Sequence, residues 1–97
     1  MTRRAPKTDR NQAEIVDALR KAGVVVHPTH MVGAGFPDLV CGYRGRTELL
    51  ECKDGNAPPS ARKLTPAQQE FIASWPGSPV HVVLSAEDAL RKMGVEI

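Results

Sequence analysis

The stretch Phe36–Lys53, FPDLVCGYRGRTELLECK, decides the fold of this chain. Asp38 follows a proline and opens a short apolar run, the segment 42–46 supplies turn residues, and a second apolar run ends in Glu51 and Lys53. Side chains on a strand alternate between faces, so Glu51 and Lys53 share one face while Cys52 points to the other. If the two runs, near 38–41 and 47–53, pair as a hairpin, Asp38 lies near Glu51. The stretch therefore predicts two carboxylates and an amine on one patch.

The rest of the chain predicts helices and strands around this hairpin. Each expected helix has a polar residue at its start and a glycine or proline near its end. The expected elements are a helix capped by Asp9 and ending at Gly23, a strand over 24–26, a loop over 28–35, a polar loop over 54–63, a helix capped by Thr65 and ending before Pro76, a strand over 80–84, and a last helix from Ser85 to Gly94. A hairpin inside such a chain favours an α/β fold in which a mixed β-sheet is flanked by helices.

Length and composition favour one small domain. The chain has 97 residues with 41% hydrophobic and 25% charged side chains, which is ordinary for a globular protein. Residues 1–8 lack periodicity and are expected to form a basic arm, followed by a single domain over 9–97. The two cysteines, Cys41 and Cys52, and the lack of a secretory or membrane-spanning pattern favour an intracellular, cytoplasmic protein with free, buried thiols and no membrane association.

The clustered carboxylates favour a divalent cation. Mg²⁺ and similar cations prefer oxygen ligands, and Asp38 and Glu51 supply them, with the backbone carbonyl of Cys52 as a further donor. Lys53 would orient an attacking water and offset charge that builds on a phosphate. The alternative is that Glu51 and Lys53 form an ordinary ion pair on one face of the strand and that Asp38 is a turn residue.

Several separated motifs resemble one nuclease family. GFPDLV, LLECK, LTPAQQEF and VHVVLS, in this order, resemble the VRR-NUC (virus-type replication-repair nuclease) branch of the PD-(D/E)XK nucleases, from about Glu14 to about Leu90. The resemblance implies a restriction-endonuclease-like αβββαβ core, here with a C-terminal helix. It makes Asp38 and Glu51 metal ligands and Lys53 the catalytic lysine. It also brings Glu14 to the metal and Gln68 to the catalytic site.

Two of these assignments have alternatives in the sequence itself. The alternative for Glu14 is an exposed glutamate on the surface of its helix. Gln68 completes a T-x-x-Q capping box with Thr65, so it could serve the helix alone, in which case Gln69 is the neighbouring candidate.

The resemblance also implies partners. It predicts a Mg²⁺- or Mn²⁺-dependent endonuclease that acts as a homodimer on branched DNA such as four-way junctions, without a small-molecule cofactor, in a bacterial or phage-infected cell. Candidate DNA-binding residues are mostly basic and gather at ends and turns: Arg4, Lys7, Arg10, His30, Tyr43, Arg44, Arg46, Arg62 and Lys63. Their alternative is a solvated surface. Two rival functions stay open, namely a non-catalytic nucleic-acid-binding module and a nicking or restriction-like nuclease that acts on ordinary duplex DNA.

Overall fold

The structure is a computed structural model that describes residues 11–96, and its elements follow the order α-β-β-β-α-β-α. They are α1 (Gln12–Lys21), β1 (Val25–Pro28), β2 (Leu39–Tyr43), β3 (Arg46–Cys52), a 3-10 turn η1 (Pro59–Arg62), α2 (Pro66–Ser74), β4 (His81–Val83) and α3 (Ala86–Lys92). This order and the α/β class agree with the prediction from the sequence. The predicted basic arm, residues 1–8, lies outside the described part of the chain.

The four strands form one mixed sheet in the order β1-β2-β3-β4. Strand β2 pairs antiparallel with both β1 and β3, and β4 runs parallel to β3. Arg44 and Gly45 form the two-residue turn of the central hairpin, with φ of 49° and 82°. Positive φ at both positions is typical of a type I′ turn, whose twist matches that of the paired strands. The hairpin is thus confirmed, with Leu39 opposite Leu50.

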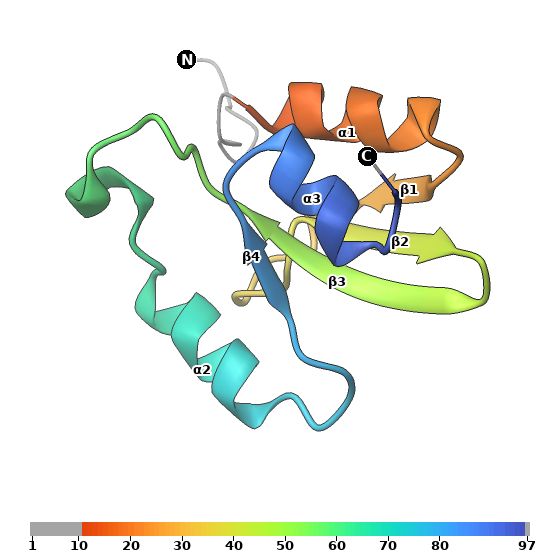
Figure 1. Cartoon of the computed structure of the whole chain (residues 1–97). Coiled ribbons are helices and arrows are strands. Elements are labelled where there is room, and N and C mark those ends of the chain that lie inside the picture. Colours follow the sequence, from red (N-terminus) through yellow and green to blue (C-terminus); the bar gives the residue numbers. More distant parts are fainter. Residues whose placement is uncertain (1–10, 97) are drawn as a thin grey trace, which may run out of the picture.

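Helices α1 and α3 pack together on one face of the sheet, as Figure 1 shows. In α1 the fully buried side chains are Ile15 and Leu19, four positions apart, which is the spacing of one helix face. Burying each such side chain contributes about 1.5–3 kcal/mol. The remaining core comes from the strands, from α3 and from residues directly beside them, namely Val24, Val26, Leu39, Cys41, Leu50, Cys52, Val83, Ala89 and Met93.

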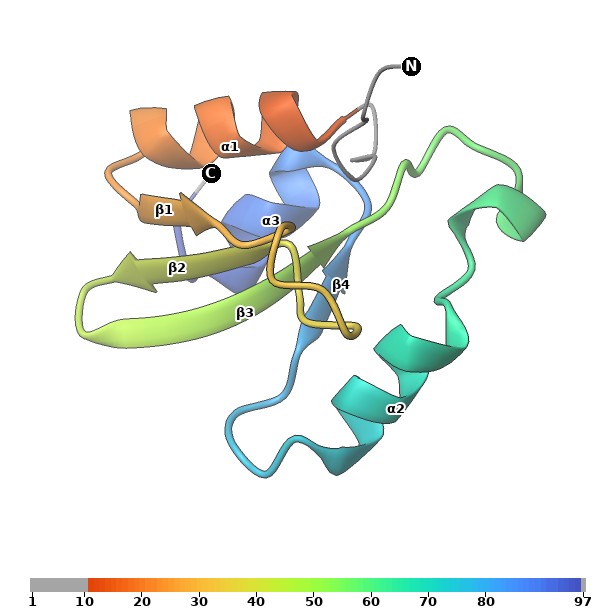
Figure 2. The same ribbon diagram turned by 180° about the vertical axis from the view of Figure 1, so that it is seen from behind.

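Helix α2 stands away from this core, at the far side of the sheet (Figures 1 and 2). Its residues are all at least partly exposed. Phe71 contacts Phe36 edge to face and stacks on Trp75, with 5.2 Å between ring centroids in each pair. Gly35 lies so close to the first turn of α2 that a Cβ there would overlap the Ala67 carbonyl. A few specific contacts, rather than a buried stripe, hold this helix.

The helix starts show where local sequence decides and where it does not. Thr65 and Ser85 cap α2 and α3 with their side chains, as predicted. The predicted cap of α1, Asp9, lies outside the described residues, and the helix begins at Gln12 with Asn11 in the capping position. The Asn11 side chain does not cap the helix: its Nδ2 donates to the carbonyls of Lys53 and Leu84, and its Oδ1 has no hydrogen-bond partner among the described residues. None of the helices within residues 11–96 is long and apolar enough to cross a membrane.

Candidate active site

Asp38 is fixed from both sides of its strand. Thr29 closes the loop before β2, because its backbone N–H donates to the Asp38 carbonyl (2.6 Å) and its hydroxyl donates to the Pro37 carbonyl (2.7 Å). The Asp38 carboxylate accepts a bond from the backbone N–H of Cys52 through Oδ2 (2.9 Å). The side chain therefore spans from β2 to the end of β3. Its predicted nearness to Glu51 follows from the same register.

Glu51 and Lys53 lie at the end of β3, on the face opposite α1 and α3. Both are buried, with 2% of Glu51 and 8% of Lys53 exposed. The Lys53 Nζ lies 3.8 Å from the Glu51 Oε2. Removing charged groups from water costs several kcal/mol per ion unless they are paired and hydrogen-bonded. The same-face ion pair of the alternative interpretation is therefore present, but it is buried and not on the surface.

Gln68 joins this pair from the first turn of α2. Its Nε2 donates to Glu51 Oε2 (2.8 Å), and its Oε1 accepts from Lys53 Nζ (3.1 Å). The same Oε1 accepts from the backbone N–H of Thr65 (2.9 Å), while the Gln68 N–H donates to the Thr65 hydroxyl (3.1 Å). Gln68 therefore completes the capping box and reaches the site at once. Gln69, the neighbouring candidate, instead donates to the Leu64 carbonyl.

Glu14 lies at the same end of the sheet but in a different group of residues. It sits in the first turn of α1, is exposed, and lines an open cavity of about 340 Å³ with Asn11, Asp54 and Asn56. Asn11 ties this turn to the end of β3 through its bond to the Lys53 carbonyl. Within residues 11–96 no three His, Cys, Asp or Glu side chains are gathered as a metal site. The structure therefore places Glu14 in this neighbouring cavity, and its role as a metal ligand stays a prediction.

Asp38 and Glu51 nevertheless fit a hard divalent cation. They offer carboxylate oxygens from adjacent strands, and Asp38 is oriented by its bond to the Cys52 N–H. Mg²⁺ is commonly held by only one or two carboxylates, with water and substrate phosphate completing its shell. The Cys52 carbonyl stays a predicted further ligand.

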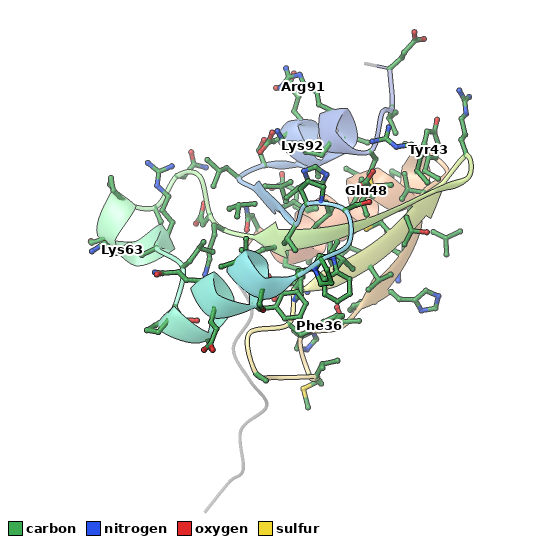
Figure 3. All side chains as sticks on the ribbon, turned by 90° about the horizontal axis from the view of Figure 1, so that it is seen from below. Phe36, Tyr43, Glu48, Lys63, Arg91 and Lys92 are labelled. Carbon is green, nitrogen blue, oxygen red and sulfur yellow. The ribbon has the colours of Figure 1, made fainter. Side chains whose placement is uncertain are left out.

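The candidate DNA-binding residues fall into separate regions. Arg4, Lys7 and Arg10 lie outside the described residues. Tyr43 and Arg44 are at the hairpin turn, where the guanidinium lies 5.2 Å from the ring centroid. Strand rise places Arg46, at this end of β3, about 17 Å from Glu51. Arg62 donates to the Gly55 carbonyl (3.4 Å). Lys63, directly after η1, is exposed (Figure 3).

Arg46 is engaged within the fold. It donates to Glu48 Oε2 through Nε (3.2 Å) and Nη2 (2.9 Å), and to the carbonyls of Lys92 and Met93 at the end of α3. His81 Nε2 lies 3.0 Å from the other Glu48 oxygen. Glu48 thus anchors β3 to β4 and α3. Sequence reasoning missed it, although its even spacing from Leu50 and Cys52 places it on the buried face.

The last residues that the sequence singled out are His30 and the two cysteines. His30 is partly buried, and its Nδ1 is a buried atom without a hydrogen-bond partner among the described residues. Neither Cys41 nor Cys52 forms a disulfide, and both are buried on the face away from the site, as predicted. Burial raises the pKa of the Cys41 thiol from 9.0 to about 11. That thiol is protonated, and therefore a poor nucleophile, near neutral pH.

Comparison with known proteins adds no relative. No protein-family model matches the chain, and neither does any curated protein or solved structure.

Proposed function

We propose that this chain is a metal-dependent endonuclease that hydrolyses phosphodiester bonds in DNA. The observation that carries the proposal is the buried network of Glu51, Lys53 and Gln68 beside Asp38. The element order α-β-β-β-α-β, with the acidic residues on the central hairpin, supports a restriction-endonuclease-like core of the VRR-NUC type. The proposal takes its family from the motifs quoted above.

In this proposal each residue has one task. Asp38 and Glu51 hold Mg²⁺ or Mn²⁺, with the Cys52 carbonyl and Glu14 as further oxygen donors. The cation, when bound, polarises the phosphodiester and makes a bound water more acidic. Lys53 donates to the attacking water or to the phosphate oxygens, where negative charge grows in the transition state. Gln68 orients the Glu51 carboxylate and the Lys53 amine. In this proposal the cation and the Lys53 amine act on neighbouring atoms of the same phosphodiester.

The proposed substrate is branched DNA, bound by a homodimer. Two equivalent sites related by a two-fold axis suit a four-way junction, which has comparable symmetry. The proposed contacts to the DNA backbone are Arg44, Arg62, Lys63 and the basic residues before position 11.

Cleavage of matched substrates tests the proposal. A linear duplex, a flapped duplex and a four-way junction with the same arm sequences are end-labelled and incubated with Mn²⁺ or Mg²⁺, each with a parallel sample in EDTA. We expect cleavage only with metal, and faster on branched substrates. Equal rates on all three would favour the duplex nuclease, whereas binding without cleavage would favour the non-catalytic module.

A further inference from the structure

Helices α2 and α3 begin with the same kind of cap, but only the cap of α2 touches the candidate site. Ser85 accepts from the Asp88 N–H at the start of α3, and Thr65 accepts from the Gln68 N–H at the start of α2. In α2 the glutamine also bonds back to the Thr65 N–H, and its remaining contacts go to Glu51 and Lys53. The start of α2 is therefore built into the site.

The cap fixes which way round the Gln68 amide lies. A backbone N–H and a lysine ammonium only donate, so the amide atom that faces Thr65 N and Lys53 Nζ must be the oxygen. The amide nitrogen then faces Glu51 Oε2, where it donates over 2.8 Å. A reversed amide would set its NH₂ against two donors and its oxygen against a carboxylate. The side chain has one orientation that satisfies all its neighbours.

This orientation also sets the spacing of the charged pair. The Lys53 amine bonds to the Gln68 oxygen at 3.1 Å and stays 3.8 Å from Glu51 Oε2, beyond normal hydrogen-bond length. Without the amide between them, the two charges would attract each other into direct contact. Both groups would then lose the positions that the proposed reaction needs.

We propose that Thr65 is a positioning residue of the site, which acts through Gln68 to hold Glu51 and Lys53 apart and oriented. The kinetic test of this inference rests on the proposed function, whereas its NMR test does not. Thr65 makes two hydrogen bonds with Gln68: its hydroxyl accepts from the Gln68 backbone N–H, and its own backbone N–H donates to the Gln68 side-chain oxygen. The hydroxyl thus fixes the backbone of Gln68, and the N–H fixes the amide that reaches Glu51 and Lys53. Replacing a residue that orients a metal ligand commonly lowers metal affinity or activity by about 10- to 100-fold.

Three variants separate positioning from helix stability. Thr65→Val keeps the shape of the side chain and removes the acceptor, Thr65→Ser keeps the acceptor, and Ser85→Ala removes the matched cap from α3. We expect Thr65→Val to lower kcat about tenfold or more at saturating Mn²⁺ and DNA, with little change in KM. Thr65→Ser should keep kcat close to wild type. Ser85→Ala should lower the melting temperature without lowering kcat.

A second readout does not need catalysis. The side-chain NH₂ resonances of Gln68, assigned by their disappearance in Gln68→Met, report the contact with Glu51. We expect Thr65→Val to shift them toward the values of an exposed glutamine, because the Gln68 backbone loses the hydroxyl that holds it in place. Thr65→Ser and Ser85→Ala should leave them unchanged. Unchanged Gln68 resonances in Thr65→Val would overturn the inference. An unchanged kcat in Thr65→Val, with an active wild type, would overturn it too. A wild type that never cuts, with the expected NMR shift, would refute the nuclease and support the positioning role.

Discussion

At the scale of single residues, the site depends on three polar side chains that satisfy one another. Glu51 and Lys53 are buried, and each contacts the amide of Gln68. Removing one partner of a buried ion pair leaves the other charge buried without a counter-charge. The resulting loss of stability is larger than the stability that the complete pair contributes. We therefore expect substitutions here to affect stability as well as activity, so the fold of each variant has to be measured together with its cleavage rate.

Strand alternation and the hairpin register predicted how the charged residues of the site are arranged, but not the role of Gln68. The E-x-K spacing alone places Glu51 and Lys53 on one face of a strand, and the register of a short hairpin brings Asp38 beside them. The role of Gln68 could not be resolved from the sequence, because capping and site contact looked like alternatives. In the structure they use different bonds of one amide. Asn11 and Thr29 were missed because hydrogen bonds to backbone carbonyls leave no sequence pattern.

Cys41 gives a prediction about pH that is independent of the proposed function. Its pKa is raised from 9.0 to about 11 by burial, so the unfolded chain loses the thiol proton at lower pH than the folded chain does. Below pH 9 the thiol is protonated in both states, and between 9 and 11 ionisation favours unfolding. We expect the free energy of unfolding to fall through this window with a slope of about 1.4 kcal/mol per pH unit from this group.

Urea unfolding at several pH values, for the wild type and Cys41→Ala, measures that slope. The variant should be less stable throughout but should depend less steeply on pH between 9 and 11. Parallel stability curves for the two proteins would show that the thiol ionises equally in both states.

At the scale of elements, α2 is the part whose placement the sequence left undetermined. Its capping box and its end near Pro76 were predicted from local residues, and both are confirmed. Its position was not predictable, because it depends on contacts far apart in the chain: Gln68 with β3, and Phe71 with Phe36. The start of α1 differed from expectation for a similar reason, since Asn11 bonds to the ends of two strands instead of to its own helix.

Gly35 tests how closely the loop before β2 must approach α2. Gly33 and Gly35 both have positive φ, of 82° and 79°, so alanine at either position costs about 1 kcal/mol in backbone strain. Only at Gly35 would the new Cβ meet another segment, the Ala67 carbonyl. We expect Gly35→Ala to be clearly less stable than Gly33→Ala and to displace α2.

Trp75 reports this displacement, because it is the single tryptophan of the chain and stacks on Phe71. Its fluorescence should shift to longer wavelength in Gly35→Ala and stay unchanged in Gly33→Ala. Equal stability and equal spectra for the two variants would mean that the loop yields without moving the helix.

At the scale of the whole molecule, the α/β class and the mixed sheet followed from the order of periodic segments. The type of sheet was predictable because a tight hairpin forces antiparallel pairing, whereas the crossover through α2 allows β4 to run parallel to β3. Assembly is another matter, because the surface pattern of one chain does not identify its partner.

We expect a homodimer in solution. Light scattering at working concentration should give about twice the mass of one chain, since the proposed substrate presents two equivalent cutting positions. A monomeric mass would contradict the dimer and would leave each molecule with one cutting site.

The most direct test of the central claim compares the wild type with Lys53→Ala on one labelled four-way junction. Folding is checked by circular dichroism, binding by gel shift in Ca²⁺, and cleavage in Mn²⁺ under single-turnover conditions. We expect Lys53→Ala to be less stable than the wild type but still folded at the assay temperature, to bind the junction, and to lose cleavage by about a hundredfold or more. Cleavage by Lys53→Ala at the wild-type rate would remove this lysine from the mechanism, and a metal-loaded wild type that leaves the junction intact would contradict the whole account.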